Sequence, residues 1–97
     1  MRIELKKFGD ILISRPAGRE AFLVMSSNLI GDIKKEENII IDFAGVKVLT
    51  PSWADEVITK LAENYSVKVE NTDNPTVQAT LKILSQYSGL TLSQSKY

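Results

Sequence analysis

The sequence predicts a small α/β domain, a mixed sheet of about four strands with helices, in the order β-β-α-β-α-β-α. Short β-branched runs alternate with longer segments whose apolar residues recur every three or four positions, the pattern of strands and amphipathic helices. The strand–helix–strand succession from Ile39 to Val69 predicts parallel neighbours with a right-handed crossover. A chain of 97 residues, 43% hydrophobic and 25% charged, is typical of a single domain. We therefore expect one domain over residues 1–97, with a loose tail over about residues 90–97.

The first 13 residues predict two short strands. Residues 2–6 alternate between polar and apolar side chains, which indicates a half-buried strand. Ile11, Leu12 and Ile13 form a second apolar run. Because Gly9-Asp10 separates the two runs, the pattern favours a hairpin.

A helix is predicted next, with Ser14 as a candidate cap and Pro16 in the first turn. Gly18 weakens the beginning of this helix. Its apolar face is formed by Ala21, Phe22, Met25, Leu29 and Ile33, and the polar run 34–38 ends it.

The clearest strand covers residues 39–43. Its isoleucines show no polar alternation, so we expect it at the centre of the sheet with both faces covered. A second helix follows, in which Thr50 is the cap before Pro51, or Ser52 caps and Asp55 completes a capping box. Its apolar stripe is Ala54, Val57, Ile58, Leu61 and Tyr65.

The last third predicts one more strand and one more helix. Val67 and Val69 alternate with polar residues, as in a half-buried strand. After a polar turn, Asn74-Pro75 predicts a capped helix start. Val77, Leu81 and Leu84 have the spacing of a buried face, and Gly89 is a natural stop.

Composition excludes several classes of function. Twelve basic and twelve acidic residues give no net charge, so no nucleic acid is expected as a partner. The chain has no cysteine and no histidine, which excludes disulfides, thiolate or imidazole metal sites and an imidazole base. We expect neither a metal nor a cofactor. The N-terminus lacks the apolar region of a signal peptide, and no apolar run is long enough to span a bilayer. The expected location is cytoplasmic, without membrane association.

Four segments resemble the STAS-like family of uncharacterised bacterial domains, which are distant relatives of the anti-sigma factor antagonists. They are Ile-Ile-Ile-Asp-Phe-Ala-Gly-Val (39–46), Leu-Thr-Pro-Ser-Trp-Ala-Asp-Glu-Val (49–57), Leu-Ile-Ser-Arg (12–15) and Val-Lys-Val-Glu-Asn (67–71). The resemblance implies a protein-docking surface at the start of the second helix. In the antagonists a Ser or Thr at this place is phosphorylated by a partner kinase of the GHKL ATPase type, which breaks the complex.

The resemblance makes Ser52 and Thr50 the candidate phospho-acceptors. The best register places Pro51 where the antagonists carry the phosphorylated residue, with Ser52 one position later. A plain capping or first-turn function is the alternative for both hydroxyls.

Five residues are candidate partner contacts around this helix start: Trp53, Asp55, Glu56, Arg15 and Arg19. Trp53 is either half-buried against the sheet or an exposed anchor, since tryptophan is frequent at the centre of interfaces. Arg15 and Arg19 either meet acidic groups or a phosphate on a partner, or are surface charges. Asp55 and Glu56 lie within one turn of Ser52 and would repel a phosphate there.

Asp42 and Gly45 are predicted to organise the loop after the central strand. Asp42 follows three isoleucines at the carboxyl end of that strand, where it accepts backbone N–H bonds or, as the alternative, holds Mg²⁺. Gly45 suits a tight backbone turn.

The chain lacks an obvious catalytic constellation, so the sequence favours a protein-binding or regulatory module over an enzyme. The expected partner is a GHKL-type ATPase/kinase or another regulator. The alternatives are a structural or decoy domain, either self-associating or a phage-encoded inhibitor, and a carboxylate-based enzyme that uses Asp42 with Asp55 or Glu56. The sequence fixes neither the oligomeric state nor the partner.

Overall fold

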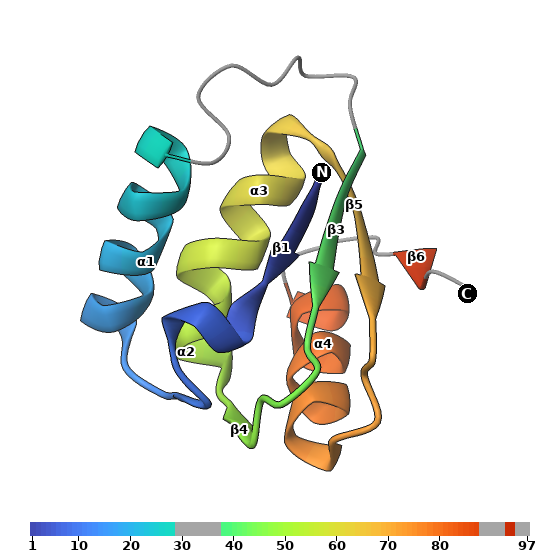
Figure 1. Ribbon diagram of the computed structural model, residues 1–97. Coiled ribbons are helices and arrows are strands. Elements are labelled where there is room, and N and C mark those ends of the chain that lie inside the picture. Colours follow the sequence, from blue (N-terminus) through green and yellow to red (C-terminus); the bar gives the residue numbers. More distant parts are fainter. Residues whose placement is uncertain (29–37, 88–92, 95–97) are drawn as a thin grey trace.

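A computed structural model describes residues 1–28, 38–87 and 93–94 (Figure 1). Its strands are β1 Arg2–Glu4, β2 Ile11–Leu12, β3 Asn38–Asp42, β4 Val48–Leu49, β5 Ser66–Glu70 and β6 Ser93–Gln94. A 3-10 turn covers Leu5–Phe8. The helices are α1 Arg15–Asn28, α4 Pro75–Tyr87, and a continuous helix over 51–64 that we call the second helix. It is composed of α2 Pro51–Ala54, a π-helical turn Asp55–Thr59, and α3 Lys60–Asn64.

All the strand pairs are parallel. The main sheet has the order β1-β3-β5-β6, and β2 and β4 form a separate two-stranded sheet. The predicted hairpin and mixed sheet are therefore wrong. The 3-10 turn and Gly9, with φ +128°, lead the chain out of the main sheet, and Ile11–Leu12 then pairs with Val48–Leu49 instead of with β1.

The strand order explains why the helices gather on one side of the sheet. From β1 to β3, β5 and β6 the chain always advances in the same direction. Because crossovers between parallel strands are right-handed, the connecting helices lie on the same face. One apolar cluster accordingly joins that face to all the helices; its members from the main sheet are Ile3, Ile39, Ile41, Val67 and Val69.

The opposite face of the main sheet is polar. Arg2, Asp42 and Glu70 project from it, and half-buried Ile40 lies between Arg2 and Lys68 in the register. β3 is central, as predicted, but among the described residues the expectation that both of its faces are covered is wrong. Ile40 has charged neighbours on both flanking strands, whose aliphatic stems can shield an isoleucine without a second layer.

Three helix starts follow the sequence prediction. The N–H of Ala17 donates to Ser14 Oγ at 3.2 Å, that of Trp53 to Thr50 Oγ1 at 3.4 Å, and that of Thr76 to Asn74 Oδ1 at 2.8 Å. The alternative capping box from Ser52 to Asp55 is wrong, because Thr50 is the cap.

Parts of the predicted elements lie outside the described residues, namely Leu29 and Ile33 of the first helix, and Gly89. Of the predicted loose tail, only Ser93–Gln94 is described, and it pairs with β5 as strand β6. Within the described ranges no helix has the length and apolarity needed to cross a membrane.

Candidate functional site

α1 and the second helix run side by side in the same direction (Figure 1). Two contacts are consistent with this parallel course. Thr50 Oγ1 donates to the carbonyl of Ile13 at 2.5 Å just before the helices begin. Further along, Arg19 Nε lies 3.6 Å from Glu56 Oε1. Both helices therefore begin at the same end of the molecule.

Gly18 permits this close approach. A Cβ at this position would lie 2.7 Å from the Trp53 carbonyl oxygen and 3.1 Å from Glu56 Cβ. The first of these is a backbone atom, which a rotamer change cannot move away. The sequence showed Gly18 only as a weak point in a helix, because its packing partner lies in a distant segment.

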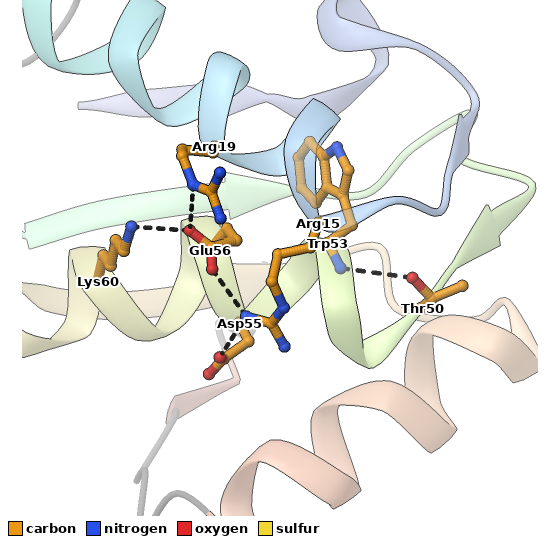
Figure 2. Close-up of polar contacts among 7 residues, drawn as sticks. All are labelled: Arg15, Arg19, Thr50, Trp53, Asp55, Glu56 and Lys60. Carbon is orange, nitrogen blue, oxygen red and sulfur yellow. Dashed lines mark hydrogen bonds and ion pairs between the residues drawn. The ribbon is translucent and has the colours of Figure 1, made fainter.

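A cluster of charged side chains bridges the two helices, as Figure 2 shows. Arg15 Nη1 donates to Asp55 Oδ2 at 3.0 Å and to Glu56 Oε2 at 2.7 Å. Lys60 Nζ donates to Glu56 Oε1 at 2.8 Å, and Arg19 approaches the same oxygen. We call these five residues the charge cluster.

Four members of the charge cluster were predicted as partner contacts, and the structure brings them together. Arg15, Arg19, Asp55 and Glu56 pair with one another, so their charges are already engaged within the chain. Lys60 was missed, although its position four residues after Glu56 is a recognised spacing for helical ion pairs.

Two members of the charge cluster, Glu56 and Arg15, have shifted pKa values, and both shifts favour the ionised form. The hydrogen bond from Lys60, followed by that from Arg15, lowers the pKa of Glu56 from 4.5 to about 2, against a smaller opposing effect of burial. Hydrogen bonds to Glu56 and then Asp55 raise the pKa of Arg15. Three cations and two anions leave one net positive charge on this face.

Trp53 is in the core. Its exposed fraction is 1%, and it belongs to the main apolar cluster. Both predictions for this residue, half-buried and exposed anchor, are therefore wrong. The backbone of Trp53 lies against α1 at Gly18, which has no side chain to hold the two helices apart.

The two candidate phospho-acceptors differ in accessibility. Thr50 Oγ1 donates to the carbonyl of Ile13 and accepts from the Trp53 N–H. This hydroxyl therefore connects the end of β2 to the second helix through hydrogen bonds. Ser52, the second residue of the helix, is exposed.

Beside this helix start lie two exposed isoleucines that sequence reasoning did not select. Ile11 is 56% exposed and Ile13 is 52% exposed, whereas Leu12 between them is buried. The sequence shows only an apolar run here, which does not reveal that two of the three residues are exposed. The carbonyl of Ile13 accepts from Thr50 Oγ1, and Ile11 pairs with Val48, so β2 ends beside the start of the second helix.

Asp42 organises the loop after β3, as predicted. Its Oδ1 accepts the N–H of Ala44 at 2.9 Å and the side-chain amide of Asn71 at 2.7 Å. Its Oδ2 accepts Arg2 Nη1 at 2.9 Å, and Arg2 also pairs with Glu70. Burial would raise the pKa of Asp42, but together these hydrogen bonds and the charge of Arg2 hold it below its usual value.

Gly45 makes the tight turn expected of it, with φ +83° and no room for a Cβ beside Lys6. The alternative function of Asp42 as a Mg²⁺ ligand finds no support among the described residues, where no group of three or more His, Cys, Asp or Glu could hold a metal.

The carboxylate pair required for the enzyme alternative is not assembled. Asp42 projects from the polar face of the sheet. Asp55 and Glu56 belong to the second helix, which packs on the apolar face. Asp42 thus shares no site with either carboxylate: it pairs with Arg2, whereas Asp55 and Glu56 share Arg15.

A family model described as a STAS-like domain of unknown function (DUF4325) matches residues 27–77, slightly more than half of the chain. The matched segment contains β3, β5 and the whole second helix. Comparisons with curated proteins and with solved structures gave no significant match.

Proposed function

Because this chain belongs to the STAS-like domain family of unknown function, we propose that it is a protein-binding module and not an enzyme. It docks a partner through the surface where the second helix begins, which Ile11, Ile13 and Ser52 form. The partner class is a GHKL-type ATPase/kinase or another regulator, following the resemblance to the anti-sigma factor antagonists.

The observation that carries this proposal is the pair of exposed isoleucines beside the helix start. Large apolar side chains that are exposed together mark interaction sites more often than isolated ones do. Ile11 and Ile13 are each more than half exposed, whereas the charged candidates nearby are paired within the chain. Apolar contact therefore supplies the docking energy, and the charge cluster forms the polar border.

Ser52 is the proposed switch on this surface. A kinase would transfer the γ-phosphoryl group of a nucleoside triphosphate to Ser52 Oγ. The new O–P bond replaces the bond to the nucleoside diphosphate, and the hydroxyl proton leaves to a base of the kinase. The phosphate adds about −1.5 to −2 charges beside the isoleucines, which opposes apolar contact with a partner.

Capture experiments with single variants test the docking surface. The immobilised chain is exposed to lysate of its source cells as wild type, Ile11→Ser, Ile13→Ser and the control Leu23→Ser. Leu23 is 60% exposed on α1 and is therefore a matched apolar residue outside the surface. We expect wild type and Leu23→Ser to retain an ATPase or regulator that both isoleucine variants lose. Retention of the same proteins by all four chains contradicts the proposal.

Intact-mass spectrometry of the chain from its source, with peptide mapping of residues 47–60, tests the switch. One added phosphate on Ser52 is expected, and none on Thr50. An unmodified chain, from cells in which the gene is active, would eliminate the switch and leave a constitutive docking module.

A further inference from the structure

We propose that Arg15 is the residue that responds to phosphorylation of Ser52, by leaving Asp55 and binding the phosphate. This inference deepens the proposed function and rests on it for the modification itself. The contacts and charges that support it are those between α1 and the second helix.

The parallel course of the two helices brings Arg15 to the beginning of the second helix. Ile13 meets Thr50 just before the two helices begin, and Gly18 meets Trp53 and Glu56. Arg15 is in the first turn of α1, and its side chain extends along the second helix to Asp55 and Glu56.

The surface of the second helix leads to the same placement. The N–H of Asp55 bonds to the Pro51 carbonyl in the α-helical manner, so residues three and four positions after Ser52 share its face. Those residues are Asp55 and Glu56, and Arg15 binds both. The Arg15 guanidinium group is therefore bound to the two residues that neighbour Ser52 on this face of the helix, which is the basis for assigning it to a phosphate on Ser52.

Arg15 has donors to offer. Both of its ion pairs are made by Nη1, which leaves the N–H groups of Nε and Nη2 outside these pairs. A guanidinium group binds phosphate oxygens through two parallel N–H bonds. The side chain of Arg15 is 44% exposed, so it can change its orientation without disturbing the core.

Asp55 is the partner that Arg15 releases. Its side chain is 39% exposed, whereas that of Glu56 is 10% exposed and also holds Lys60. A doubly charged phosphate outcompetes one exposed carboxylate for the same guanidinium group. The face then changes from one net positive charge to about one net negative charge, and a partner selected for one state is repelled by the other.

The test uses the full chain with phosphoserine installed at position 52 during synthesis. The second ionisation of the phosphate is followed by ³¹P NMR in wild type, Arg15→Gln and the control Arg19→Gln. Arg19 belongs to the same cluster but lies one helical turn further along α1. We expect Arg15→Gln to raise the phosphate pKa by at least about half a unit and Arg19→Gln to change it little. Equal values in wild type and Arg15→Gln overturn the inference.

Two further measurements test whether Arg15 itself binds the phosphate. Repeating the comparison in Asp55→Asn removes any contribution from an unpaired Asp55, and the effect of Arg15→Gln should persist. The Nε–Hε signal of Arg15 in the unmutated chain should shift on phosphorylation, while that of Arg19 stays in place. An unmoved Arg15 signal also overturns the inference.

The outcome is separable from that of the proposed function. The phosphoserine is introduced chemically, so neither a kinase nor a partner is required. If Arg15 binds the phosphate but the chain captures no regulator, this inference stands and the proposed function fails. If the chain captures a regulator but Arg15 does not bind the phosphate, the proposed function stands and this inference fails.

Discussion

At the scale of single residues, Glu56 lies between two helices and is held by Lys60 and Arg15. Its pKa falls from 4.5 to about 2 in the folded chain. A lowered pKa means that the folded state favours the ionised form. The stabilisation is therefore complete above the unfolded value and is lost as the pH falls towards 2.

We expect the free energy of unfolding of the wild type to decrease between about pH 5 and pH 2, and to decrease less steeply in Glu56→Gln. Urea titrations at several pH values measure both slopes. Glu63→Gln, at an exposed position of the same helix, is the matched control and should follow the wild type. Identical slopes for Glu56→Gln and wild type would show that the ion pairs contribute nothing to folding.

The two hydroxyls at the helix start should differ in their effect on stability. Thr50→Ala removes a cap and a bond to Ile13, and should cost about 1–2 kcal/mol. Ser52→Ala alters an exposed side chain and should stay within about 0.5 kcal/mol. Thermal or urea unfolding compares the two. A larger loss for Ser52→Ala would mean that Ser52, and not Thr50, holds the helix start.

Several residue functions could be predicted from the sequence because they are local. Ser14, Thr50 and Asn74 precede the helices they cap, and Asp42 precedes the Ala44 amide that it accepts. The complete burial of Trp53 could not be predicted in the same way, because it depends on a glycine 35 positions earlier.

At the scale of elements, the contact between α1 and the second helix determines the site. It aligns the charge cluster, buries Trp53 and brings Ile13 to Thr50. The π-helical turn Asp55–Thr59 lies within this contact. Such turns shift the following residues around the helix axis and are frequent at functional sites.

Gly18→Ala tests the closeness of that contact. In an ordinary exposed helix the change would stabilise by up to about 1 kcal/mol. Here the new methyl group would meet the Trp53 carbonyl oxygen at 2.7 Å, so we expect destabilisation by about 1–3 kcal/mol instead. Urea unfolding gives the sign. Ala17→Gly, at an exposed neighbouring position, controls for helix propensity alone; a stabilised Gly18→Ala chain would refute the close packing.

Element prediction succeeded where periodicity carries the information. The second helix, α4 and β5 were predicted from apolar spacing, and β3 from an unbroken run of isoleucines. The pairing of β2 was not predicted. A run such as Ile11–Leu12 indicates a strand, but it does not indicate which strand lies next to it. Val48–Leu49, which pairs with it, is a strand of two residues after a loop and offers almost no pattern to detect.

At the scale of the whole molecule, successive strands are added to the main sheet in one direction, which leaves one apolar face and one polar face. All the helices pack on the first, and the second carries the contacts of Arg2 with Asp42 and Glu70. Among the described strands the order of the main sheet never reverses, so this part of the chain has no topological switch point, which is where parallel α/β folds usually open a ligand crevice.

The same strand order governs how the chain must fold. Every strand pairs with a segment beyond an intervening helix, and the pairs that are closest in sequence still join Lys68 with Ser93. No local hairpin can form first and guide the rest, so loop closure precedes the first sheet contact, which slows folding. On the ribosome, β1 remains without its neighbour until Asn38–Asp42 has emerged, and Asn38–Asp42 in turn waits for Ser66–Glu70. The main sheet can therefore be assembled only in the order of the chain, one strand at a time, and each strand exposes an unpaired edge until the next one has been made.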